Sequence, residues 1–198
     1  MSVVIAIKDK NKIYLGCDTQ ASGGNNKINL KDASSQKVWH HNNLPDLVLG
    51  GAGSLRDIQI IQTSINLFDL TSVLLNKIDY TFLVQHFFTN VYNILAEKNR
   101  IGRDTTGNLV NIIDCEFIVA FGDKMYHIDQ EGTVIEANDY LVIGSGSEVA
   151  IGVLENNKNK KPQTRIQEAI KACAENTLYV NNEMYITDTT EEVDDVIL

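Results

Sequence analysis

The order in which strands and helices are predicted along this 198-residue chain is the feature that most restricts its fold. An N-terminal strand hairpin comes first, followed by two more strands, two helices, a block of strands, two further helices and a last strand. Helices gathered in pairs, between strands that follow one another closely, are typical of the α+β class. We therefore predict two antiparallel sheets packed face to face, with helices on each outer side.

Strands are predicted where β-branched or alternating runs are bounded by turn residues, at 3–7, 12–17, 36–40, 47–51, 115–121, 124–128, 133–137, 141–143 and 184–186. The glycine- and asparagine-rich segment 22–26 is predicted as a loop. Helices are predicted after the N-cap Ser54, from Asp79 or Thr81 onward, over 148–154, and from Pro162 to about Thr177. The apolar stripe of the first helix consists of Ile58, Ile61, Ile65 and Phe68. That of the second consists of Val84, Phe88, Val91 and Leu95, widened by Leu83, Phe87 and Ile94.

Composition restricts the class of protein. A hydrophobic content of 43% and a charged content of 22% predict a folded domain, which we place at 1–187, followed by an acidic tail at 188–198. The net charge of −9 argues against nucleic-acid and anionic-membrane partners, which need a positive surface. The longest uncharged stretch, 80–96, is interrupted by polar residues and predicts an amphipathic helix, not a membrane span. Because the apolar run after Met1 is too short for a signal peptide, we expect a cytoplasmic protein.

No common catalytic or metal-binding motif is present. The three cysteines, Cys17, Cys115 and Cys173, form no CxxC pair, which predicts neither a zinc knuckle nor a disulfide framework. The four histidines, at positions 40, 41, 86 and 127, match no metal-binding spacing, and neither a phosphate-binding glycine loop nor a GxSxG turn is found. We therefore predict that no cofactor is required.

The N-terminus offers a different chemistry. Removal of Met1 would leave a free amine on Ser2, at the start of a core strand. An α-amine has a pKa near ~8, so it is partly neutral at pH 7 and can accept the proton of the hydroxyl on the same residue. Nucleophile and base would then be one residue. Met-Ser starts also occur in proteins of every kind, so this feature alone leaves an ordinary N-terminus as the alternative.

Further positions fit the same chemistry. Asp18 ends the second strand, Lys37 stands in Ser34-Ser35-Gln36-Lys37-Val38, and Gly53 precedes Asp57 by four residues. Gly144-Ser145-Gly146 precedes a helix, and Leu178-Tyr179-Val180-Asn181 follows another. In this order and spacing, from Ser2 to about Ile186, the chain resembles the proteasome β-subunit family and its bacterial HslV-type relatives. That resemblance implies an N-terminal-nucleophile hydrolase with a four-layer αββα sandwich, two antiparallel sheets flanked by helix pairs.

The resemblance also implies residue roles. Ser2 would be the nucleophile, Lys37 would favour its deprotonation, and Asp18 would hold Lys37. The N–H of Gly53 would donate to the oxyanion, Ser145 would relay protons near the amine, and Glu175 falls where proteasome β-subunits carry an aspartate. A peptide would lie as an added strand against 20–22 and 51–53. The implied substrate-binding residues are Gln20, Ala21, Ser22, Gly51 and Leu55.

Cofactors and partners follow from the same resemblance. The carbonyls of Ala174, Thr177 and Val180 would hold a structural monovalent or divalent cation, and no other cofactor is implied. The family assembles as homo-oligomeric rings that take peptides or unfolded proteins, often delivered by an ATP-dependent unfoldase. The expected function is therefore peptide-bond hydrolysis through an acyl-enzyme on Ser2.

Alternatives remain open at the level of sequence. The chain departs from the family in having serine for threonine at the nucleophile, Glu175 for aspartate, and Leu178 where proteasome β-subunits place a serine. A retained Met1 would block the amine and indicate an inactive, ring-forming structural subunit. A closed pocket around Ser2 would favour an amidase for small non-peptide amides. Asp18 and Lys37 could also be an ordinary ion pair, Gly53 a glycine that only the turn requires, and Ser145 a helix cap.

Overall fold

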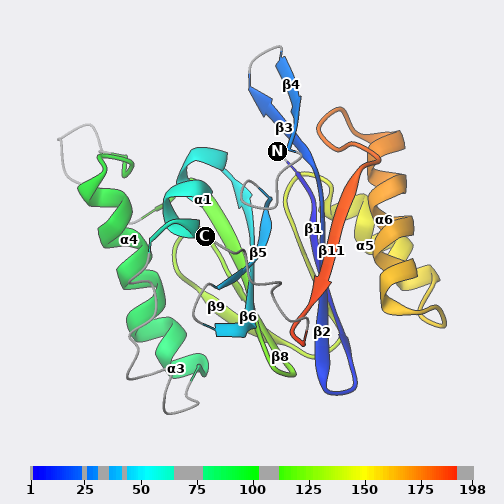
Figure 1. Ribbon diagram of the computed structural model, residues 1–198, viewed down its shortest axis with the longest axis horizontal. Coiled ribbons are helices and arrows are strands. Elements are labelled where there is room, and N and C mark those ends of the chain that lie inside the picture. The colour runs from blue at the N-terminus through cyan, green and yellow to red at the C-terminus, as the bar shows by residue number, and fades with distance from the viewer. Residues whose placement is uncertain are drawn as a thin grey trace, which may run out of the picture.

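The computed structural model describes residues 2–23, 26–30, 36–41, 44–64, 78–102 and 112–190. These residues form four layers, in which two antiparallel sheets lie face to face between two groups of helices (Figure 1). The α+β sandwich predicted from the order of elements is confirmed. The start of the first strand positions Ser2, because that strand begins at Val4, two residues after it.

The first sheet has four strands in the order β10-β1-β2-β11. Their bounds are Tyr140–Ile143 for β10, Val4–Asp9 for β1, Lys12–Asp18 for β2 and Met184–Asp188 for β11. Helices α5, Ser147–Asn156, and α6, Pro162–Asn176, cover its outer face (Figure 1). Strand β1 is internal, and its first four residues, Val4 to Ile7, are apolar and buried on both faces, which fixes where Ser2 emerges.

The second sheet has five strands in sequence order, β5 to β9. Their bounds are Val38–His41, Leu44–Gly53, Cys115–Phe121, Lys124–Ile128 and Val134–Ala137. Its outer face is covered by α1, Leu55–Gln62, and by one continuous helical rod made of α3, Tyr80–Phe82, η2, Leu83–Phe87, and α4, Phe88–Glu97. Figure 1 shows this rod on the side of the molecule opposite to α5 and α6.

Three apolar layers hold the four structural layers together. The middle layer lies between the two sheets and includes Val4, Leu15, Val48, Ile118 and Met125. A second layer joins the five-stranded sheet to α1 and α4, and a third joins the four-stranded sheet to α5 and α6. Alternate residues of each strand thus face different apolar layers, as the two-residue period of strands requires.

The helical stripe predicted over 83–95 is confirmed except at Val84, since Phe88 and Ile94 also pack, partly buried, against the same apolar layer. Val84 is 42% exposed, whereas Leu83, Phe87, Val91 and Leu95 are fully buried, each four residues after the last. The cause is the π-helical turn at 83–87, which holds more residues per turn than an α-helix. This changes the angular position of the side chains around the helix axis, so that Leu83 and Phe87 face the core. In the first helix Ile58 and Ile61 are buried as predicted, while Ile65 and Phe68 lie outside the described residues.

The loop predicted at 22–26 is also wrong at its ends, where the structure forms a hairpin. Strand β3, Gln20–Gly23, pairs with β4, Asn26–Asn29, and the pair projects beyond the two sheets (Figure 1). No apolar alternation marks these strands, because three of the four β4 residues are exposed and only the fourth is partly buried. Backbone pairing without a buried face therefore leaves no hydrophobic pattern in the sequence.

The first residues of the predicted acidic tail belong to strand β11 or directly follow it. That strand extends to Asp188, and Thr189 is buried, with its hydroxyl donating to the Gly122 carbonyl at 2.8 Å. The rest of the predicted acidic tail, 191–198, lies outside the described residues. Within the part of the chain that is described, no helix is both long and apolar enough to cross a membrane.

Candidate active site

Ser2 lies just before the N-terminal end of the internal strand β1, one residue before the fully buried Val3. Only 3% of Ser2 is exposed. Its carbonyl oxygen accepts from the Gly146 N–H at 3.3 Å and from the Ser145 hydroxyl at 3.4 Å. The N–H of Val3, in the same peptide unit, donates to Asp18 Oδ1 at 3.0 Å. The peptide unit that follows the predicted nucleophile is therefore held at both its oxygen and its nitrogen.

Asp18 and Lys37 form a buried ion pair between the two sheets. Asp18 ends β2, Lys37 directly precedes β5, and Lys37 Nζ lies 2.7 Å from Asp18 Oδ1 with the two side chains 4% and 0% exposed. Asp18 also accepts the Gln20 N–H at 3.0 Å through Oδ2. A buried carboxylate with three donors is well compensated, so the lysine keeps a fixed place beside Ser2.

Gly53 ends β6 where the chain turns into α1. Its φ is +118°, and a Cβ at this position would lie 2.4 Å from the Asp114 carbonyl oxygen. The position therefore requires glycine for conformational and steric reasons. Ser54 caps α1, as predicted, because its hydroxyl accepts from the Asp57 N–H at 3.4 Å. The start of α1 adds a partial positive charge at this end of the cavity.

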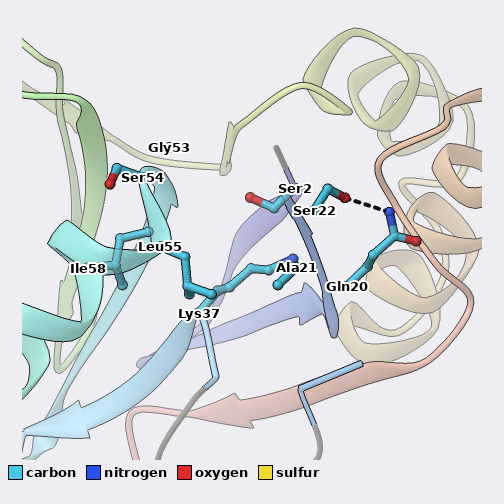
Figure 2. A pocket seen from close by; sticks show the side chains of 9 residues that line it. All are labelled: Ser2, Gln20, Ala21, Ser22, Lys37, Gly53, Ser54, Leu55 and Ile58. Carbon is cyan, nitrogen blue, oxygen red and sulfur yellow. Dashed lines mark hydrogen bonds between the residues drawn. The ribbon is translucent and has the colours of Figure 1, made fainter. Parts of the chain in front are cut away.

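A cavity of about 150 Å³ brings these groups together. Its lining residues are Ser2, Gln20, Ala21, Ser22, Lys37, Gly53, Ser54, Leu55 and Ile58. Figure 2 shows the strand with Gln20, Ala21 and Ser22 on one side and the start of α1 on the other, with the Ser2 hydroxyl between them. The Lys37 side chain extends from β5 toward the segment that carries Ser2 (Figure 2).

Of the six catalytic residues predicted from sequence, three line this cavity, two contact residues that line it, and one does neither. Ser2, Lys37 and Gly53 line it, and Asp18 lies behind Lys37. Ser145 touches the site through the Ser2 carbonyl. Glu175, near the end of α6, is exposed and lies outside the cavity lining.

The predicted substrate-binding residues are also placed by the structure. Gln20, Ala21, Ser22 and Leu55 line the cavity. Gly51 is buried just behind it, where a Cβ would meet Ile58 Cγ1 at 3.0 Å. Gln20 donates through Nε2 to the Ser22 hydroxyl at 2.9 Å and to the Leu178 carbonyl at 3.2 Å. These contacts hold the side chain of Gln20, the first residue of β3, against the segment that follows α6.

The residues predicted to hold a cation lie at and after the C-terminal end of α6. Ala174 is in the helix, Thr177 is its C-cap, and Val180 is buried beyond it. Among the described residues no group of three or more His, Cys, Asp or Glu side chains is placed to hold a metal ion. A cation at this place would be bound by carbonyl oxygens, as the sequence analysis expects.

Sequence reasoning missed three residues of this region. Ser54 and Ile58, assigned as cap and core, also line the cavity. Glu116 accepts the Gly144 N–H at 3.0 Å through Oε1, which ties β7 to the loop against Ser2. The one available signal was that Glu116 is the only charged residue in an otherwise apolar strand.

The cysteines do not compete with Ser2 as nucleophiles. Burial raises the pKa of the Cys17 thiol to about 12 and that of Cys173 to about 11, and it also raises the pKa of Cys115. Thiols with such pKa values stay protonated at neutral pH and are poor nucleophiles. These thiols are therefore not the nucleophile of this site.

Comparisons with known proteins agree with this geometry. Residues 2–183 match the family model described as proteasome subunit. The chain is 30% identical over 178 residues to a proteasome subunit beta of Nanoarchaeum equitans, covering 86% of this chain and 80% of the relative. It is 24% identical over 185 residues to the ATP-dependent protease subunit HslV of Campylobacter concisus, covering 91% and 93% of the two chains.

Solved structures show the same fold. A Thiobacillus denitrificans protein named BPH, solved in complex with epoxomicin, superposes with a TM-score of 0.69 at 16% identity, covering 94% of this chain and 97% of the other. The HslV of Trypanosoma brucei superposes with a TM-score of 0.64 at 19% identity, covering 94% and 98%. The four-layer αββα arrangement inferred from the sequence resemblance is thereby confirmed.

Proposed function

Because the chain belongs to the proteasome subunit family, in which HslV-type hydrolases share its fold, we propose that it is an active peptidase whose nucleophile is Ser2. One observation carries the proposal: Ser2, Lys37 and Gly53, contributed by both sheets, line one cavity, and Asp18 holds Lys37 at 2.7 Å. These are the groups that an N-terminal-nucleophile hydrolysis needs.

The proposed reaction is acyl transfer to the Ser2 hydroxyl. Once Met1 is removed, the Ser2 amine accepts the hydroxyl proton as the oxygen attacks the peptide carbonyl, and the Gly53 N–H stabilises the oxyanion. The amine then gives the proton to the leaving nitrogen, and an ester between Ser2 and the acyl part of the substrate remains. Water, deprotonated by the same amine, hydrolyses this ester. The positive charge of Lys37 favours the deprotonated form of its neighbour throughout.

The shape of the cavity supports a peptide substrate. Strand β3 and the end of β6 face each other across the cavity, so an extended peptide can lie between Gln20–Gly23 and 51–53 and accept backbone hydrogen bonds. The side chains of Ala21, Leu55 and Ile58 give the cavity an apolar wall. We propose that an aliphatic residue precedes the bond that is cut, since about 150 Å³ admits a side chain of that size.

Assembly and delivery belong to the same proposal. The family relationship supports a homo-oligomeric ring, and the relative from Campylobacter concisus is named an ATP-dependent protease subunit. We propose that this chain also assembles as a ring, with its Ser2 sites facing unfolded protein supplied by an ATP-driven partner. A cytoplasmic location remains the expectation from the sequence.

Intact mass spectrometry with an α′,β′-epoxyketone tests the nucleophile. Such a probe carries a ketone and an epoxide on adjacent carbons, so a hydroxyl and an amine of one residue can attack both and close a ring. We expect the purified protein to lack Met1 and to gain one probe mass. Ser2→Ala should abolish the adduct, whereas Ser64→Ala, which alters a serine at the far end of α1, should form it at the normal rate.

Two other results of this experiment would favour the inactive ring subunit or the amidase instead. A full-length mass without an adduct would leave the inactive ring subunit with a blocked amine. An adduct accompanied by turnover of small amides, but by no turnover of fluorogenic tripeptides or unfolded casein, would indicate the amidase.

A further inference from the structure

We propose that Glu116, held by His127, is a positioning residue that fixes Ser2 opposite the oxyanion donor. The inference rests on the proposed function and extends it to a residue outside the cavity. The loop 144–146 connects β10 to α5 and lies against the Ser2 carbonyl.

The loop encloses the Ser2 carbonyl closely. The Gly146 N–H and the Ser145 hydroxyl both donate to it. Gly144 has a φ of +93°, and a Cβ there would lie 2.3 Å from the same oxygen. Because rotation of the Ser2–Val3 peptide unit would move the Ser2 hydroxyl, the place of this loop decides where the nucleophile points.

Glu116 is the link between this loop and the opposite sheet. Its Oε1 accepts the Gly144 N–H at 3.0 Å, and its Oε2 lies 3.0 Å from His127 Nε2 on the neighbouring strand β8. Glu116 and His127 alternate with residues of the outer apolar layer, so both side chains lie at the rim of the space between the sheets. Each carboxylate oxygen therefore has one partner, and the side chain is fixed although it is 28% exposed.

Two such links hold the halves of the site together. The nucleophile stands on the four-stranded sheet, whereas Gly53 ends a strand of the five-stranded sheet. The Lys37–Asp18 pair joins the sheets on one side of Ser2, and the Glu116–Gly144 hydrogen bond joins them on the other. Loss of the second link would let the nucleophile shift relative to the oxyanion donor, without altering the peptide groove along β3.

Steady-state kinetics on three variants tests the inference. In Glu116→Ala we expect kcat to fall about a hundredfold, the cost of a misplacement of about 1 Å, while KM changes by no more than about twofold. Glu116→Gln should recover most of kcat, because an amide oxygen can still accept the Gly144 N–H. Glu136→Ala removes an exposed glutamate of β9, which β8 separates from β7, and should behave as wild type.

Hydrogen exchange supplies a readout that does not depend on catalysis. The Gly144 and Gly146 amides should exchange faster in Glu116→Ala than in Glu136→Ala. Unchanged exchange at these amides, or an unchanged kcat in Glu116→Ala, would overturn the inference, as would an equal loss in the alanine and glutamine variants. A wild-type protein that forms no epoxyketone adduct would instead refute the proposed function itself, so the two failures are distinct.

Discussion

At the scale of single residues, the site depends on a buried charge that one substitution can leave unpaired. Lys37→Met keeps a long side chain but removes the cation from Asp18, which is completely buried. We expect the free energy of unfolding to fall by about 3–5 kcal/mol, since an uncompensated buried carboxylate is costly. The rate of acylation should fall at least about a hundredfold, as when one electrostatic contact of an active site is lost.

The control for this substitution is an exposed pair of the same length. Lys160 Nζ lies 2.7 Å from Glu168 Oε1, but the two side chains are 45% and 38% exposed to solvent. Lys160→Met should therefore cost at most about 1 kcal/mol and leave acylation unchanged. Urea denaturation measures the loss of stability. Mass spectrometry of samples quenched at set times measures the acylation rate, under conditions in which each variant is folded. A folded Lys37→Met protein that is acylated normally would show that the lysine has no part in the reaction.

Alanine substitutions at two glycines with positive φ can separate the effect of backbone strain from that of a steric contact with Ser2. An alanine at either Gly144 or Gly122 carries the conformational cost of a left-handed backbone, about 1 kcal/mol. At Gly122 the added Cβ meets nothing within 4 Å, whereas at Gly144 it meets the Ser2 carbonyl. We expect Gly122→Ala to be acylated at the normal rate and Gly144→Ala to lose acylation almost completely. Equal reactivity in both variants would contradict the proposed contact of the 144–146 loop with Ser2.

At the scale of elements, the π-helical turn at 83–87 decides which face of the rod α3–η2–α4 is buried. Phe87 is fully buried and packs edge-on against Phe117, with ring centroids 6.1 Å apart, whereas Val84 points to solvent. We expect Phe87→Ala to destabilise the protein by about 3–5 kcal/mol and Val84→Ala to change its stability by less than about 0.5 kcal/mol. Thermal and urea unfolding of the two variants measures the difference, and a larger effect at Val84 would show that Val84, and not Phe87, faces the core.

The same segment shows what sequence patterns can and cannot determine. Apolar spacing correctly predicted an amphipathic helix here, but Val84 and Leu83 both fit a helical stripe, and only packing against the sheet selects Leu83. The hairpin β3–β4 was missed for the opposite reason, because its strands pair without burying an apolar face. Strands with a continuous apolar run, such as those of Val4 and Val119, were predicted well because burial on both faces leaves no other choice.

Some residues of the candidate site could be predicted from the sequence, whereas others could not. Ser2, Asp18, Lys37 and Gly53 were found because their order along the chain resembles that of a known family, not because any local pattern marks them. Glu116 belongs to the site only through the fold, which brings β7 against a loop that follows 28 residues later. Glu175 was predicted only because it falls at the position of an aspartate in the family. In the structure its side chain is exposed on α6, a placement that the alignment of positions alone does not reveal.

At the scale of the whole molecule, charge bears on the proposed ring. Each chain carries a net charge of −9, so neighbouring subunits repel one another at long range. The range of this repulsion is set by salt, because the Debye length is about 30 Å at 0.01 M and about 10 Å at 0.1 M. A ring held by apolar and backbone contacts should therefore dissociate on dilution at low salt and persist at higher salt.

Sedimentation velocity across a dilution series at about 0.01 M and about 0.15 M salt measures this difference, since the Debye length shortens to about 8 Å at the higher value. At the higher salt we expect a single large species, the ring, throughout the dilution series. At the lower salt we expect the fraction of single chains to grow as the protein is diluted. Lys160→Met makes the chain more negative by one charge and should shift the transition toward higher salt. Dissociation that instead increases with salt would mean that complementary ion pairs across the contacts outweigh the net repulsion, because screening weakens attraction and repulsion alike.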